Sequence, residues 1–294
     1  MKRQRKFWRS SLPEDTQFLR FIGHADATSV CAVSKTFLGL VLRSFLKIPF
    51  LFANKQSPQH FAVFRAFIKN EAFWEMCGEE QKKWLFPYLQ LPQGDVYHDI
   101  LVKSHVTDLR IVGNNTTLHG RVDVFGNNCS LEHFCIIPRR KNVQVSICVH
   151  SVTKRLVMSM KNIVVDAASS VFSVYAKNAD LRFEDVGVAV CRGHGFYFVN
   201  CNAHIKNSAV SATIGLETCN SITEFQDTNI TEAADGVRLF SGSRAIFSGK
   251  SQVFSHRNTF YISDAKSSVA LLKNDCVKNI LIKTNRIDNV HRAF

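Results

Sequence analysis

Proline is scarce in the last two thirds of this 294-residue chain. Five of its six prolines precede residue 93, and only Pro138 follows. Because proline has no N–H to donate to a β-ladder, long hydrogen-bonded strands exclude it. The distribution predicts two regions built on different principles, a proline-containing first third and a longer region of strand ladders.

Other features are missing as well. No apolar run reaches the roughly 20 residues that a membrane span needs, and no early run is typical of a signal peptide. The nine cysteines form no Cys-x-x-Cys pair, which fits small buried hydrophobes in a reducing compartment. The eleven histidines lack ligand spacing and there is no glycine-rich phosphate loop, so we expect no metal and no cofactor. These absences predict a soluble cytoplasmic or nuclear protein without a membrane partner.

The charge is uneven. The chain has 37 basic and 24 acidic residues, a net charge of +13. Five of the basic residues lie in the first nine positions, and the rest of the excess is spread over residues 100–294. Aromatic residues are not interleaved with the basic ones, which argues against a nucleic-acid partner. The start, residues 1–10, is either a solvated disordered tail or a nuclear-import signal. The basic residues of that signal would be Lys2, Arg3, Arg5 and Lys6.

Residues 11–52 are predicted to form three short helices. Pro13 stands near a first helical position, followed by two acidic residues that the helix dipole favours. Apolar residues recur at helical spacing, and Gly23 separates the first two segments. Residues 53–104 are predicted to continue as a helical linker or cap, rich in phenylalanine.

The first of these segments resembles an F-box. The residues that carry the resemblance are Leu12-Pro13-Glu14-Asp15, the apolar cluster Phe18-Leu19-Phe21-Ile22, Asp26, Val30, Val33-Ser34-Lys35 and Phe37. The connection between the first two helices is about two residues shorter than in the family, with Gly23-His24 before Asp26. The resemblance implies docking to the Skp-type adaptor of a cullin–RING ubiquitin ligase. The adaptor-binding residues it implies are Leu12, Pro13, Leu19, Ile22, Val30, Val33 and Phe37. An unrelated small helical cap is the alternative.

A repeat of about 21 residues begins near residue 105. Five segments start alike, at Gly195, Gly215, Gly236, Thr259 and Asn279, with offsets of 20, 21, 23 and 20. Each holds three short Val/Ile/Phe-rich runs separated by small or polar residues, which indicates three strands per unit. Three strands per repeat of this length predict a right-handed parallel β-helix over residues 105–294, with eight or nine coils. The fold class expected for the whole chain is therefore α + β, a small helical F-box-like region followed by this solenoid.

The alternation of side chains predicts which residues lie inside the solenoid. Asn-Asn pairs at 114–115 and 127–128 suit the corners, because asparagine tolerates left-handed geometry. Cys201 and Cys219 are expected to join inward columns. The expected inward residues are Phe196, Phe198, Leu216, Val237, Leu239, Phe260 and Ile262.

The predicted solenoid is similar to the pectin-lyase-like superfamily. The order of F-box and β-helix resembles F-box proteins with carbohydrate-binding-and-sugar-hydrolase-type repeats. That resemblance implies a β-helix that recruits a substrate. Pairing a shortened F-box with a degenerate β-helix also suggests a divergent lineage, with a virus-encoded protein as one interpretation.

Polygalacturonase-like enzymes of this fold class combine a carboxylate pair with Gly-His-Gly and Arg-x-Lys. Here Gly193-His194-Gly195 follows the acidic pair Glu184-Asp185 by only eight residues, less than half a coil. Stacked catalytic groups should lie about one coil apart, and adjacent strand residues point to opposite faces. The Gly-His-Gly sequence is better explained as a turn at a corner of the solenoid than as part of a sugar site formed by Glu184, Asp185 and His194.

The function predicted from the sequence is therefore a non-catalytic adaptor of a cullin–RING ubiquitin ligase. Its helices would bind the Skp-type adaptor and its solenoid an unknown protein substrate. Two alternatives stay open: a carbohydrate-binding or carbohydrate-active β-helix, and a self-assembling structural solenoid of the virion type.

Overall fold

A computed structural model describes residues 89–91, 93–138, 144–168, 170–272, 280 and 282–293. All of them belong to the second of two compact units, Tyr88–Phe294. They form eighteen parallel β-strands and one 3-10 turn, η3 (Ile287–Asn289). No α-helix occurs in this part of the chain, so the expected α + β class is wrong for it. The predicted tail 1–10 and F-box-like helices 11–52 lie outside the described residues.

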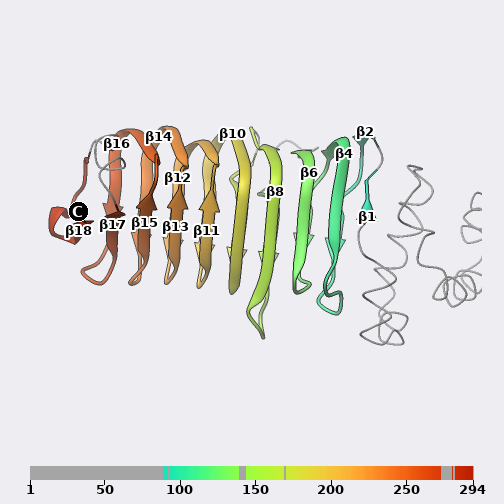
Figure 1. The fold of residues 1–294 in the computed structure, drawn as a ribbon, viewed down its shortest axis with the longest axis horizontal. Helices are drawn as coiled ribbons and strands as arrows, with labels where there is room; N and C mark the ends of the chain where they lie inside the picture. The colour runs from blue at the N-terminus through green and yellow to red at the C-terminus, as the bar shows by residue number, and fades with distance from the viewer. Residues whose placement is uncertain are drawn as a thin grey trace, which may run out of the picture. The chain divides into compact units, whose positions relative to one another are not determined.

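The strands wind into a right-handed parallel β-solenoid of about eight turns (Figure 1). This confirms the predicted solenoid and the approximate number of its coils. Each turn contributes to three parallel ladders, which we call the first, second and third ladder in chain order. The solenoid starts at Leu89, whereas helix was predicted up to residue 104.

Some strands belong to one ladder only. Strands of the first ladder are β1 (Leu89–Gln90), β11 (Asn202–Lys206), β13 (Ile222–Gln226), β15 (Arg244–Ser248), β17 (Ser268–Leu272) and β18 (Val290–Ala293). Strand β2 (Gly94–Val96) belongs to the second. Strands of the third are β3 (Ile100–Val102), β5 (Val122–Val124), β7 (Val145–His150) and β9 (Phe172–Lys177).

Longer strands bend from one ladder into the next. Those shared by the first and second ladders are β4 (Arg110–His119), β6 (Cys129–Ile137) and β8 (Leu156–Asp166). Those shared by the second and third are β12 (Ala209–Cys219), β14 (Asn229–Phe240) and β16 (Gln252–Ile262). Strand β10 (Ala179–Val199) passes through all three.

Inward side chains stack in columns along the solenoid. The register puts residues one coil apart beside each other, and alternation turns every second residue inward. All seven residues predicted to face inward are buried, with no exposed surface. The central column of the first ladder consists of Ile111, Leu131, Met160, Phe183, Ile205, Phe225, Phe247 and Leu271.

The corners depend on residues that accept positive φ. Asn115 and Asn128 have φ of 50° and 53°, which confirms the predicted Asn-Asn corners. Between the third and first ladders, Asn200 Nδ2 donates to Asn178 Oδ1 at 2.6 Å, so the corner side chains also bond from coil to coil. Residues of this corner with positive φ are Asp108, Asn128, Asn178, Asn200, Asn220 and Ser241.

The glycines that marked the repeat lie where successive coils approach closely. A Cβ at Gly215 would overlap Ile230 Cγ2 and lie 2.6 Å from the Gly236 carbonyl oxygen. We expect Gly215→Ala to lower the free energy of unfolding by about 2 to 3 kcal/mol, because the coils must separate to admit the methyl group. Urea denaturation followed by circular dichroism measures this change.

Gly187→Ala is the matched control, since its Cβ would meet only Val164 Cγ2 at 3.8 Å. Its expected change is within about 0.5 kcal/mol. Equal losses for the two variants would contradict the close-approach explanation.

Candidate functional site

The outer face of the first ladder is a lattice of paired charges. Arg110 donates two hydrogen bonds to Glu132, at 2.7 and 2.6 Å, and Lys161 Nζ lies 3.1 Å from Glu184 Oε2. Pairs on an exposed strand face contribute little to stability and leave few unpaired groups for a ligand. This face therefore resembles an ordinary solvated surface.

The three residues of the predicted sugar site do not converge. Glu184 lies on the first ladder, where the hydrogen bond from Lys161 lowers its pKa. Asp185 occupies the corner that follows, with φ of 55°. His194 lies where β10 bends into the third ladder, beside Phe172. Glu184 and His194 are thus on different ladders, and the low pKa of Glu184 does not suit a general acid.

The outer face of the third ladder has a different character. Consecutive coils place Tyr175, Tyr197, Glu217, Arg238 and Tyr261 in one outward column. The Tyr175 and Tyr197 rings stack with centroids 5.7 Å apart, and Tyr261 is 36% exposed. We call these five residues the third-ladder face. It combines a preformed aromatic stack with charged groups in register.

Phe172 and His194 extend the aromatic stack toward the bend of β10. Phe172 lies 4.9 Å from the His194 ring and 5.0 Å from the Tyr197 ring, centroid to centroid. The rings of Phe172, His194 and Tyr197 are half-buried and contact one another, so they lose little conformational freedom when a partner binds.

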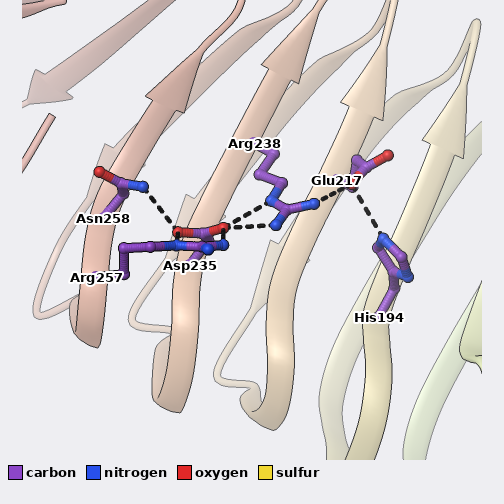
Figure 2. A network of polar contacts seen from close by, with 6 residues as sticks. All are labelled: His194, Glu217, Asp235, Arg238, Arg257 and Asn258. Atoms are coloured by element: carbon purple, nitrogen blue, oxygen red, sulfur yellow. Dashed lines mark hydrogen bonds and ion pairs between the residues drawn. The ribbon is translucent and has the colours of Figure 1, made fainter. Parts of the chain in front are cut away.

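A network of polar contacts joins four coils at this face (Figure 2). Its centre is Asp235, whose side chain is 1% exposed. Arg238 Nε donates to Asp235 Oδ2 at 2.8 Å, and Arg257 Nε donates to Asp235 Oδ1 at 2.8 Å. Asn258 Nδ2 donates to Oδ1 at 2.9 Å, and Arg257 Nη2 also contacts Oδ2. We call these residues, with Glu217 and His194, the Asp235 network.

Electrostatics explains why a carboxylate is stable there. Burial alone would raise the pKa of Asp235, but hydrogen bonds from Arg257, Arg238 and Asn258 outweigh it and hold that pKa well below its usual range. Asp235 is therefore an anion at neutral pH that holds two guanidinium groups in place.

Glu217 is held in a similar way. His194 Nε2 lies 3.0 Å from Glu217 Oε2, and Arg238 Nη1 donates to the same oxygen at 3.3 Å. Burial pushes the pKa of Glu217 up, but His194 and Arg238 together keep it below its ordinary value. With both carboxylates ionised, the arrangement suits charge recognition better than proton donation.

The cysteines are only partly as predicted. Cys201 is buried, and desolvation raises the pKa of its thiol to about 11, which makes it a packing residue. Cys219 was expected inside but is half-buried and faces outward in the third ladder, between Val199 and Phe240.

In the described ranges no cluster of three or more His, Cys, Asp or Glu is arranged to bind a metal. No helix among those residues is long and apolar enough to cross a membrane.

Comparison with family models, with curated proteins and with solved structures finds no match for this chain. The F-box, pectin-lyase-like and viral interpretations therefore gain no support beyond the parallel β-solenoid itself. The predicted adaptor-binding residues, from Leu12 to Phe37, and the basic residues from Lys2 to Lys6 lie outside the described part of the chain.

The Asp235 network was not predicted from the sequence, although the sequence contains a signal for it. His194 and Glu217 are 23 residues apart, Glu217 and Arg238 are 21, and Asp235 and Arg257 are 22. These spacings are close to the repeat length, so oppositely charged residues one repeat apart were candidates for contact. The sequence did not show which of the many such pairs share a face.

Proposed function

We propose that this chain is a recognition protein whose third-ladder face binds a protein partner. The observation that carries the proposal is the outward column of Tyr175, Tyr197, Glu217, Arg238 and Tyr261, supported from behind by the Asp235 network. Tyrosine and arginine are enriched at the residues that contribute most to protein–protein affinity. A rigid solenoid presents them without a large ordering cost.

The chemistry of the face favours binding over catalysis. The Tyr175 and Tyr197 rings stack on each other, which leaves less of their faces open to the flat face of a sugar ring, and the Tyr261 ring is tilted against Phe240. Among the described residues, the first-ladder face has mutually paired charges and no comparable group of aromatic side chains.

The proposal corresponds to the substrate-binding half of the adaptor function predicted from the sequence. Its other half, docking of residues 11–52 to a Skp-type adaptor, falls outside the described residues and stays a prediction. Binding by the third-ladder face does not depend on it.

Site-specific photo-crosslinking tests the proposal. A photo-crosslinking phenylalanine analogue replaces Tyr261 in one variant and His204, on the first-ladder face, in the control. In cells that express the chain, we expect discrete protein adducts from position 261 and at least fivefold fewer from position 204. Mass spectrometry of the adducts identifies the partner.

Three outcomes would overturn the proposal. Adduct yields that are the same at both positions would show that the third-ladder face has no special role. Adducts at position 261 made only with a second copy of the chain would favour self-assembly. Specific binding of the purified protein to a glycan array, abolished by Tyr261→Ala and without protein adducts, would favour carbohydrate recognition.

A further inference from the structure

Strands β14 and β16 are irregular at the same bend but not at the same residue. Between Ile230 and Ala233 β14 has two residues, whereas β16 has one between their partners Val253 and Ser255. The additional residue is then in the other strand: β14 has one residue between Ala233 and Asp235, whereas β16 has two between their partners Ser255 and Asn258. Staggered bulges of this kind leave the two strands imperfectly apposed over several residues.

A hollow of about 430 Å³ lies at these two staggered bulges. Its size is within the range of ligand-binding pockets in proteins. Phe254 forms an apolar wall and is 54% exposed. The lining residues are Thr231, Glu232, Val253, Phe254, Ser255, His256 and Thr259.

The same irregularity holds a cation, Arg257, which follows the lining residue His256 in the sequence. Two residues of β16 lie opposite Ala234 of β14: His256, which lines the hollow, and Arg257, whose side chain is 61% exposed. Arg257 uses Nε and Nη2 to bind Asp235. A guanidinium has five N–H donors, so an exposed one that is anchored on one edge still has donors for a second anion.

Two of the carboxylates near Arg257 are engaged in the Asp235 network. Asp235 is 1% exposed and lies behind Arg257 and Arg238, while Glu217 binds Arg238 and His194. Glu232 lines the hollow on the β14 side and is exposed, and its Oε2 accepts a hydrogen bond from Ser211 Oγ at 2.7 Å, on the preceding coil. Among the described residues, Arg257 supplies an exposed cation on the β16 side and Glu232 an exposed acidic group on the β14 side.

We propose that the hollow receives an aromatic side chain of the protein partner, and that an acidic residue next to it in the partner's sequence pairs with Arg257. The apolar wall formed by Phe254 and Val253 fits an aromatic anchor, as at other interface hot spots. The adjoining anchored guanidinium selects a carboxylate over an ammonium group. This inference rests on the proposed function and specifies the chemistry that the face recognises.

A fluorine probe in the hollow tests the proposal. The full chain is prepared with 4-fluorophenylalanine at position 254 and titrated with the peptide acetyl-Glu-Glu-Trp-amide. We expect a saturable shift of the fluorine resonance. The peptides acetyl-Lys-Lys-Trp-amide and acetyl-Glu-Glu-Ala-amide should each bind at least tenfold more weakly, because each lacks one of the two interactions.

The arginine contribution is measured by Arg257→Gln, with Arg192→Gln as the matched control. Arg192 is an exposed arginine at the corresponding bend of β10. We expect Arg257→Gln to weaken binding of the acidic peptide about tenfold, the effect of losing one charged pair. Arg192→Gln should leave it unchanged. Circular dichroism confirms that both variants are folded.

Equal affinity for all three peptides, no saturable shift, or equal losses for the two arginine variants would overturn the inference. These results differ from a failure of the proposed function. If protein adducts form at position 261 but the acidic peptide does not perturb position 254, the third-ladder face binds a partner without using the hollow.

Discussion

Replacing Asp235 with alanine is expected to lower the free energy of unfolding by about 3 kcal/mol, as for other buried ion pairs that lose one partner. The substitution leaves Arg238, 26% exposed, and Arg257, 61% exposed, without their shared carboxylate. The estimate is at the lower end for such pairs, because water can hydrate Arg257 once it is released. Urea denaturation at pH 7 measures the difference.

Asp180→Ala is the appropriate control. Asp180 also pairs with an arginine, Arg155, at 2.6 Å, but both side chains are well exposed, at 44% and 39%. An exposed pair of this kind is expected to contribute less than about 1 kcal/mol. If the two variants lost the same stability, burial of Asp235 would not be the source of its effect.

The same carboxylate predicts a dependence on pH. The folded protein holds the pKa of Asp235 below its value in the unfolded chain, about 3.9. The stability that Asp235 contributes is therefore fully present above about pH 4 and is lost as the pH falls further, toward the folded pKa. The difference between wild type and Asp235→Ala should be constant from pH 7 to pH 5 and should shrink by pH 3. A difference that grows on acidification would contradict the assignment.

Phe247→Ala is expected to cost about 4 kcal/mol, the loss typical of a phenylalanine removed from a packed core. The Phe247 side chain has no exposed surface. Its ring stacks on Phe225 with centroids 4.7 Å apart and planes at 11°, and it lies 5.7 Å from the Phe260 ring. The substitution removes contacts with both the preceding coil and the third ladder.

The loss should be local, because each coil of a solenoid contacts only its neighbours. In amide hydrogen exchange we expect faster exchange in β13, β15 and β17, with β4 and β6 unchanged. Phe254→Ala, which truncates a half-exposed ring, should change the free energy of unfolding by less than about 1 kcal/mol. Uniform acceleration across all strands would show that the solenoid unfolds as one unit.

The solenoid was predictable because its pattern is repeated. One coil alone contains three short apolar runs that fit many folds, but five similar segments with offsets of 20 to 23 residues point to stacked coils. Given the repeat, alternation within each strand was enough to place Phe196, Phe198 and Leu216 inside. The glycines at 195, 215 and 236 lie at close approaches of successive coils, a reason for their presence that the sequence did not show.

The first coil was missed for a related reason. The strands Gly94–Val96 and Ile100–Val102 are only three residues long, and short apolar runs do not distinguish strand from helix. They also follow proline-rich sequence, which favoured assigning them to the preceding region. Their pairing with β4 and β5 decides their conformation, and that contact is between residues more than 20 positions apart.

The sequence by itself determined the periodic part of this protein: the parallel solenoid, its approximate coil length, its inward columns and its asparagine corners. These follow from local rules of side-chain alternation and backbone sterics, repeated many times. The tertiary structure decided the aperiodic part. Coils of unequal length shift the register, so only the folded chain shows that Glu217 meets His194 and Arg238, or that staggered bulges in β14 and β16 form a hollow beside Arg257. The physical reason is that each such contact depends on the summed lengths of the intervening corners, which no local pattern specifies.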